Sequence, residues 1–277
     1  MTSATIGPIA ILGAGNVGQA LARGLLAAKR IAAADLALTR RHPPPQGSAA
    51  AAGLAVGTDN RAAIAGARQV VIAVQPRQLD ELLAGLKGAL DPSRHVVISV
   101  VTGVTIEQIR AQLGREAPIV RAMPNTAIAI GQSMTCLAAL PEHRAALDGA
   151  RALFDAVGTT LTIDEAMMES ATALCACGVA FFLRSIRAAS QGGIEIGFHP
   201  EEALLMAAQT ARGAAGLLMQ PGSHPEAEID RVTTPRGCTI AGLNEMEHRG
   251  FSSAMIKGII TSARKAVELY RVPARDG

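Results

Sequence analysis

"ILGAGNVGQAL", residues 11–21, decides the fold of the first half of this chain. Gly13, Gly15 and Gly18 stand in the G-x-G-x-x-G spacing, directly after a short apolar run and at the start of a helical pattern. The first glycine permits a tight turn, the second lets the backbone approach a pyrophosphate, and the third lets the helix pack closely on the strand. A purely structural glycine turn is the alternative for the spacing alone. In its strand–turn–helix setting, the stretch predicts a dinucleotide site whose phosphates face the helix N-terminus.

The pattern around this stretch continues as alternating strands and helices. Short β-branched runs, bounded by Gly, Pro or polar residues, predict strands at 8–13, 35–40, 69–74, 95–101 and 118–123. Helical stretches separate these runs, and repeated β-α-β units form a parallel sheet covered by helices. We therefore expect an α/β, Rossmann-like dinucleotide-binding domain at residues 1–162.

The rest of the chain has an all-α pattern. Helices are predicted at 164–190, 200–219, 237–249 and 252–271, with a loop at 220–228. Positions 172–183 are apolar around most of the helix, which is typical of a helix buried on every side. Residues 163–277 offer too little surface to bury it, so we expect a second subunit to do so. The prediction is an all-α dimerisation domain at 163–277 and a homodimer or higher homo-oligomer.

The bulk composition excludes several classes of protein. The chain has 277 residues, of which 49% are hydrophobic, and a net charge of +3 without a run of like charges, which predicts no nucleic-acid partner. The N-terminal stretch lacks a basic segment, and glycines end its apolar run early, so we expect a cytoplasmic protein with no membrane span. The spacing of Cys136, Cys175, Cys177 and Cys238 suits neither a disulfide framework nor zinc, so no metal is expected.

The end of the second predicted strand, "LTRRHP" at 38–43, bears on the choice of cofactor. An NAD enzyme usually carries Asp or Glu there to bind the ribose 2′-hydroxyl. Thr39, Arg40 and Arg41 stand there instead, and a hydroxyl with guanidinium groups suits a 2′-phosphate. The alternative is that these arginines are ordinary solvated surface residues. We predict NADPH as the cofactor, with NADH possible.

Seven stretches together resemble the successive motifs of the pyrroline-5-carboxylate reductase family. They are "ILGAGNVGQAL" (11–21), "TDN" (58–60), "VIAVQPRQL" (71–79), "VISVVTGVTI" (97–106), "VRAMPNTAIAIGQSMT" (120–135), "ESATALCACGVAFF" (169–182) and "VTTPRGCTIAGL" (232–243). They follow the family's order and spacing over essentially the whole chain. The resemblance implies an NAD(P)H-dependent oxidoreductase acting on a CH–NH group. It would reduce the cyclic imine 1-pyrroline-5-carboxylate to L-proline in amino-acid biosynthesis, with its imino-acid pocket at the subunit interface.

The resemblance also implies a set of cofactor-binding residues. In chain order these are Leu12, Gly13, Ala14, Gly15, Asn16, Val17, Thr39, Arg40, Asn60, Val74, Gln75, Pro76, Val101 and Thr102. The first six would line the pyrophosphate, Thr39 and Arg40 the 2′ position, and the last two the nicotinamide.

The stretch "TTPRGCTIAGL" at 233–243 is similar to the family's substrate turn. By resemblance the substrate-binding residues are Thr234, Arg236, Gly237, Cys238 and Thr239, and Thr239 is the catalytic residue that reaches the imine nitrogen. Arg236 replaces a glycine of the family pattern. It could add a charge-assisted bond to the substrate carboxylate, or it could obstruct the pocket and lose glycine's access to positive φ.

Other departures keep further functions open. Gln75 replaces the family's usual lysine, and Cys175 to Ala180 reads "CACGVA" where the family has "SGSGPA". One alternative is a reductase of another cyclic imine. A β-hydroxyacid-dehydrogenase-like enzyme is a second, although that class carries a lysine where this helix offers Arg184 and Arg187. A third alternative, from a different class, is a catalytically inactive NADP-binding regulatory homologue whose pocket Arg236 closes.

Overall fold

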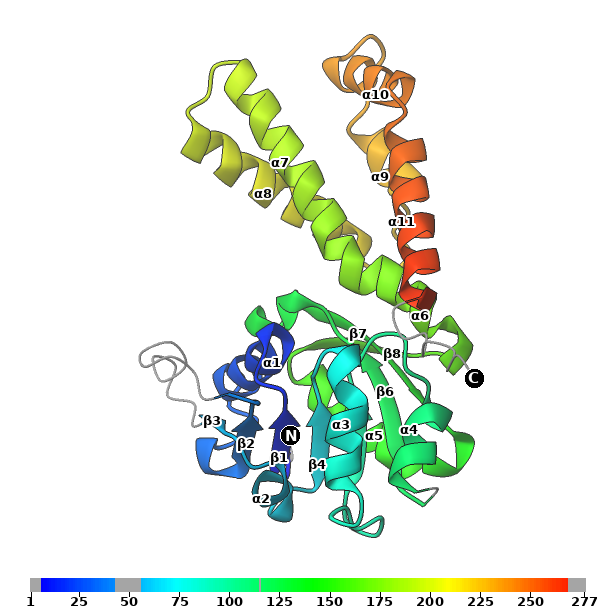
Figure 1. The fold of residues 1–277 in the computed structure, drawn as a ribbon. Coiled ribbons are helices and arrows are strands. Elements are labelled where there is room, and N and C mark those ends of the chain that lie inside the picture. Colours follow the sequence, from blue (N-terminus) through cyan, green and yellow to red (C-terminus); the bar gives the residue numbers. More distant parts are fainter. Residues whose placement is uncertain (1–5, 43–55, 115, 269–277) are drawn as a thin grey trace. The chain divides into compact units, whose positions relative to one another are not determined.

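The computed structural model describes residues 6–42, 56–114 and 116–268. The chain forms two compact units (Figure 1). The first comprises the described residues of Met1–Cys177 and of Thr261–Gly277, and the second is Gly178–Ile260. The predicted domain boundary at 162 coincides with the end of the last strand, whereas the compact units divide fifteen residues later, between 177 and 178. The helical run Glu165–Glu195 passes through that point without interruption.

Within the described residues, the first unit is built on one eight-stranded sheet. Its order is β3-β2-β1-β4-β5-β6-β7-β8, and all pairs are parallel except β6 with β7. The strands are β1 (Ile9–Leu12), β2 (Leu36–Thr39), β3 (Val56–Gly57), β4 (Gln69–Ile72), β5 (Val96–Ser99), β6 (Ile119–Met123), β7 (Ser133–Ala139) and β8 (Gly158–Thr162). The first six strands have the 3-2-1-4-5-6 order of a dinucleotide-binding sheet. The Rossmann-like prediction and all five predicted strands are confirmed.

Helices cover both faces of the sheet. They are α1 (Asn16–Ala27), α2 (Asn60–Ala65), α3 (Pro76–Leu86), α4 (Ile106–Leu113) and α5 (Arg144–Asp155). Along β1, Ile9 and Ile11 join the core that contains residues of α1 and α5, while Ala10 and Leu12 join the core that contains residues of α3 and α4. Alternate side chains of a strand point to opposite faces, so one short strand supplies both cores.

The helical part of the chain begins beside the sheet and continues into the second unit. It contains α6 (Met168–Ala171), a π-helical segment (Thr172–Cys177), α7 (Gly178–Glu195), α8 (Pro200–Leu218), α9 (Pro225–Arg231), α10 (Cys238–His248) and α11 (Phe251–Glu268). The expectation of a loop throughout 220–228 was wrong. Pro225 opens α9 there, and the His224 ring accepts a hydrogen bond from the backbone N–H of Glu226 at 3.3 Å. The end of the helix predicted to reach 271 lies outside the described residues.

The apolar helix 172–183 is not buried on every side within one chain. Phe182 and Leu183 are 63% and 59% exposed, and Leu174 is exposed as well. By length and composition alone, the run Glu165–Glu195 could cross a membrane, because it contains an 18-residue window with a mean hydropathy of 1.7. The apolar surface predicted at 172–183 is present, but the single chain leaves part of it exposed.

Candidate active site

The glycine loop joins β1 to α1 in the geometry that its spacing predicts. Gly13 has φ +110°, and a Cβ there would lie 2.5 Å from the carbonyl oxygen of Ala73, so only glycine fits. A Cβ at Gly18 would overlap the backbone of Gly13, which lets the helix begin close to the strand. At Gly15, by contrast, an added Cβ would meet no described atom within 4 Å. The backbone is thus open to a ligand at the N-terminus of α1, where phosphate charge is favoured.

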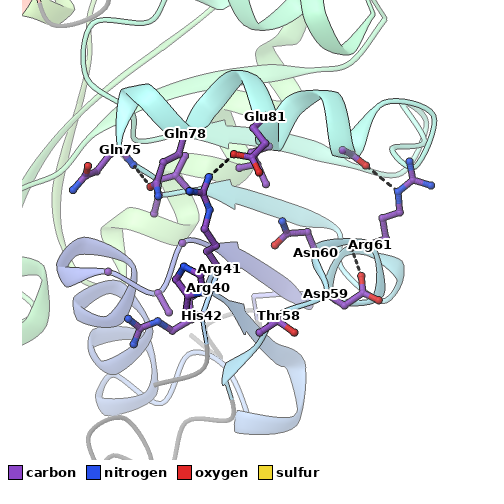
Figure 2. A pocket seen from close by; sticks show the side chains of 17 residues that line it. Arg40, Arg41, His42, Thr58, Asp59, Asn60, Arg61, Gln75, Gln78 and Glu81 are labelled. Carbon is purple, nitrogen blue, oxygen red and sulfur yellow. Dashed lines mark hydrogen bonds and ion pairs between the residues drawn. The ribbon is translucent and has the colours of Figure 1, made fainter. Parts of the chain in front are cut away.

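A cavity of about 830 Å³ opens from this loop (Figure 2). Its walls come from the glycine loop, the residues after β2, the start of α2 and one face of α3. Of the predicted cofactor residues, the cavity is lined by Gly13, Ala14, Gly15, Arg40, Asn60, Val74 and Gln75. Those that do not line it are Leu12, Asn16, Val17, Thr39, Pro76, Val101 and Thr102. Val101 and Thr102 nonetheless follow β5 at the carboxyl edge of the parallel strands, the edge at which such sheets bind ligands.

Thr39 does not line the cavity, but it hydrogen-bonds to Asn60, which does. Its side chain is buried, and its hydroxyl donates a 2.5 Å hydrogen bond to Oδ1 of Asn60. This bond orients the Asn60 carboxamide in the cavity wall. Asp59, the preceding residue of the "TDN" motif, accepts hydrogen bonds from the backbone N–H groups of Arg61 and Ala62 at 2.9 and 3.0 Å and caps α2. The motif therefore fixes a helix start and a cavity wall together.

The cavity wall is rich in cationic side chains. Arg40, Arg41 and Arg61 all line it, as does the acidic Glu81 of α3. Figure 2 shows the Arg41 side chain extended across the cavity to Glu81, with which it forms an ion pair. Arg61 donates from Nε to the carbonyl oxygen of Gly85 at 2.9 Å. Guanidinium groups in this number suit an anionic, phosphate-bearing ligand.

Sequence reasoning missed several lining residues on α3. Gln78 and Glu81 line the cavity with Gln75, the residue before the helix. Their spacing of three is the signal that could have found them, because helical residues three apart share a face. His42, Thr58, Asp59 and Arg61 were missed too, and they flank residues that were predicted.

The substrate-like turn before α10 belongs to the second unit, and it is described by itself. The N–H of Gly237 donates to the carbonyl oxygen of Thr234 at 2.9 Å. Pro235 takes the second position of this four-residue turn, and Arg236 takes the third with φ +59°. A positive φ at the third position defines a type II turn, which favours glycine there. Arg236 therefore stands in a backbone conformation that glycine adopts more readily.

Gly237 and the first turn of α10 complete this site. A Cβ on Gly237 would overlap the Thr234 hydroxyl and lie 3.0 Å from its carbonyl oxygen, so the close approach favours glycine. Among the described residues, no side chain caps α10. The first N–H groups of the helix are then available to an anion such as a carboxylate. Cys238 is exposed and Thr239 half-buried, on the first turn of α10.

The π-helical segment Thr172–Cys177 lies against the sheet in the first unit. The Asn125 carboxamide donates to the carbonyl oxygen of Cys175 at 3.2 Å, and the sulfur atoms of Cys136 and Cys175 are 3.9 Å apart. A hydrogen bond from the Cys136 thiol lowers the pKa of Cys175 to about 7. The same contact, with burial, raises the pKa of Cys136. A π-segment inside an α-helical run is a frequent feature of functional sites.

Arg121, in the distinctive "RAMPNT" stretch, forms ion pairs with two glutamates of the helical run. Its side chain is 3% exposed, and its guanidinium binds the carboxylates of Glu165 and Glu169 at 3.2 and 3.0 Å. Glu165 also accepts from the N–H of Ile106 at 2.6 Å. These contacts hold the start of the helical run against β6 and α4.

These features define a class of protein before any relative is considered: a dinucleotide-binding protein with a Rossmann-like sheet and a helical second part. A family described as pyrroline-5-carboxylate reductase dimerisation matches residues 165–269. A second, described as NADP oxidoreductase, coenzyme F420-dependent, matches residues 8–103.

The sequence relatives narrow this class. Pyrroline-5-carboxylate reductase 2 of Dictyostelium discoideum is 47% identical over 274 residues, which cover 93% of this chain and 91% of the relative. Pyrroline-5-carboxylate reductase 1 of the same organism is 50% identical over 95% of this chain, but this chain spans only 50% of its length. A solved pyrroline-5-carboxylate reductase from Coxiella burnetii matches with a TM-score of 0.85 and 28% identity, covering 97% of this chain and 100% of that one. The chain belongs to the pyrroline-5-carboxylate reductase family.

Proposed function

We propose that this protein reduces 1-pyrroline-5-carboxylate to L-proline with NADPH. The observation that carries the cofactor assignment is the glycine loop opening into a cavity whose β2 wall carries Arg40 and Arg41 instead of an acidic residue. The substrate assignment is supported by the relatives' names and by the hydrogen-bonded turn at Thr234–Gly237, which leads into an uncapped helix. A solved relative from Plasmodium falciparum, 22% identical, is described with NADP bound.

The residues of this chain fit the cofactor in three places. Gly13 to Gly15 and the N-terminus of α1 would hold the pyrophosphate, because the backbone is open at Gly15 and the first N–H groups of a helix have no partner within it. Arg40, with Asn60 oriented by its hydrogen bond, would hold the adenosine ribose and its 2′-phosphate. When bound, NADPH supplies the hydride for the imine carbon.

The turn before α10 would hold the substrate. Its carboxylate suits the uncapped N–H groups at the start of α10, and Arg236 is next to them in sequence. The Thr239 hydroxyl, in the first turn of the same helix, orients the imine nitrogen. A threonine hydroxyl is a weak acid, so its role is to position the nitrogen and relay a proton rather than to supply one freely. Electrostatic positioning of a bound iminium carries most of the rate in this proposal.

We also propose that the protein acts as a homo-oligomer. The dimerisation family matches the residues that expose Phe182, Leu183 and the other large apolar side chains of α7. A partner subunit would cover this surface, and this explains the membrane-like hydropathy of Glu165–Glu195 without a bilayer. A cytoplasmic location without membrane or nucleic-acid partners stays a prediction.

The test is the oxidation of NADPH, followed by its absorbance, with racemic 1-pyrroline-5-carboxylate and a small panel of other cyclic imines. Turnover that is fastest with 1-pyrroline-5-carboxylate is expected, with NADPH preferred over NADH. Faster turnover of another imine would reassign the substrate. Tight NADPH binding without turnover of any imine would contradict the proposal and favour the regulatory alternative.

A further inference from the structure

Two adjacent arginines in the cofactor cavity differ in their partners. The side chain of Arg41 is 51% exposed and forms an ion pair with the carboxylate of Glu81, which is 76% exposed on α3. The side chain of Arg40 has no hydrogen-bond or ion-pair partner among the described residues, although its backbone N–H donates to Gly57 at 3.0 Å. The cavity thus presents one uncommitted guanidinium and one that already has a counter-charge.

We propose that Glu81 is a specificity-determining residue for the cofactor, because it holds Arg41 in an ion pair that a 2′-phosphate must replace. This inference rests on the proposed cofactor site. NADPH can use Arg41 only if the guanidinium leaves Glu81, whereas NADH, which lacks the phosphate, leaves the pair intact. Glu81 therefore lowers the affinity for NADPH and leaves the affinity for NADH unchanged, which reduces the ratio of the two affinities.

The exposure of the pair makes such an exchange feasible. An ion pair between solvated side chains contributes little to stability, whereas a guanidinium binds a phosphate through charge-assisted and often bidentate hydrogen bonds. Glu81 lies across the cavity from the residues after β2, on the same wall as Gln75 and Gln78 (Figure 2). The ion pair therefore holds the Arg41 guanidinium toward α3 and away from Arg40, the residue predicted to bind the 2′-phosphate.

The other charged groups of this wall have separate contacts. Arg61 is directed to the backbone oxygens of Gly85 and Lys87, and Asp59 caps α2. Glu81 is thus a positioning residue that acts through Arg41. Its role predicts a change only for ligands that carry a 2′-phosphate, which a merely structural role would not produce.

The experiment is isothermal titration calorimetry of the full chain with adenosine 2′,5′-bisphosphate and with AMP, which differ only in the 2′-phosphate. In Glu81→Gln, the Kd for the bisphosphate should fall about two- to fivefold, the range expected for an exposed ion pair, and the Kd for AMP should not change. Asp80→Asn is the matched control. It removes the same charge from the adjacent, exposed position of α3, where Asp80 accepts from Gln112 at 2.8 Å and does not line the cavity. Titrations at an ionic strength of about 0.15 M limit long-range charge effects.

A second background tests whether Glu81 acts through Arg41. The gain from Glu81→Gln should disappear in an Arg41→Ala background, because there is no guanidinium to release. The ratio of kcat/KM for NADPH to that for NADH should rise in Glu81→Gln by the same factor as the binding ratio. Unchanged bisphosphate binding in Glu81→Gln, equal changes for both ligands, an equal gain in Asp80→Asn, or persistence of the gain without Arg41 would each overturn the inference. A wild-type protein that binds neither ligand would instead overturn the proposed cofactor site, and the inference with it.

Discussion

Replacing Arg236 by glycine separates two properties of the turn before α10, its backbone strain and its charge. Arg236 has φ +59°, and the side chain is exposed within its unit. A residue with a Cβ costs about 1–2 kcal/mol in this left-handed conformation, whereas glycine adopts it freely but loses about 0.5–1 kcal/mol through its more flexible unfolded state. The free energy of unfolding should therefore rise by roughly 0.5–1 kcal/mol in Arg236→Gly, which corresponds to an increase in Tm of roughly 1–3 °C.

Arg236→Ala is the matched control, because it removes the guanidinium and keeps the Cβ. Its Tm should stay at or below that of the wild type, as the strain at φ +59° remains. Thermal unfolding of the three proteins, at equal concentration because the assembly affects Tm, measures this difference. An alanine variant as stable as the glycine variant would refute the reasoning from backbone strain.

Steady-state kinetics of the same variants tests whether the charge of Arg236 contributes to substrate binding. If Arg236 binds the substrate carboxylate, both variants should raise the KM for 1-pyrroline-5-carboxylate by roughly tenfold, the value of one charge-assisted hydrogen bond. If the side chain obstructs the pocket, both variants should be more active than the wild type. We expect the first result, because an arginine beside a helix N-terminus reinforces an anion site. Unchanged kinetics in both variants would show that the side chain has no part in binding.

Four further outcomes are expected. Thr239→Ala should lower kcat at least tenfold and leave the Kd for NADPH unchanged, because its hydroxyl acts on the substrate; an equal loss of NADPH affinity would contradict this assignment. Gly13→Ala should abolish NADPH binding, measured by calorimetry, since a Cβ there would lie 2.5 Å from a backbone oxygen at the end of β4. Alkylation of Cys175 should accelerate as the pH rises through about 7, because its thiolate forms there; in Cys136→Ala the midpoint should move up towards about 8.5, and an unmoved midpoint would refute the role of the hydrogen bond. Phe182→Asp should yield a folded chain that no longer assembles, measured by light scattering, because the side chain is 63% exposed in one subunit.

The sequence predicted those parts of the fold whose signal is local. The glycine spacing and five apolar runs were sufficient for the central strands, because a buried parallel strand is apolar throughout. β8, "GTTLT", carries three threonines on the edge of the sheet and lacks that signal. β7 is a seven-residue strand in which Ser, Thr, Cys and Ala outnumber the large apolar residues, and it follows the "RAMPNT" stretch after only a short 3-10 turn. α9 has seven residues, too few for a clear helical period.

The site shows the same division between local and non-local information. Arg40 and Asn60 could be assigned from motifs, and both line the cavity. The pairing of Arg41 with Glu81 could not, because it joins residues 40 positions apart on two elements whose separation depends on packing. Thr39 was assigned to the cofactor directly, whereas the fold buries its hydroxyl and commits it to Asn60. A motif indicates which residues belong to a site, and the packing decides which of them are free to act.

Arg121 shows how one charge can fix the position of a long apolar helix. A helix that is apolar around most of its surface has no hydrophobic face to set its rotation. Glu165 and Glu169 are four residues apart and therefore share a face, and both bind the buried guanidinium of Arg121. Rotating or sliding the start of the run would leave that guanidinium buried without a counter-charge, at a cost of about 3–5 kcal/mol. The same setting brings Cys175, further along the run, against Cys136 and Asn125. The charged cluster in the most distinctive motif of the chain thus positions the π-helical segment at the sheet, whereas hydrophobic packing alone would leave its register open.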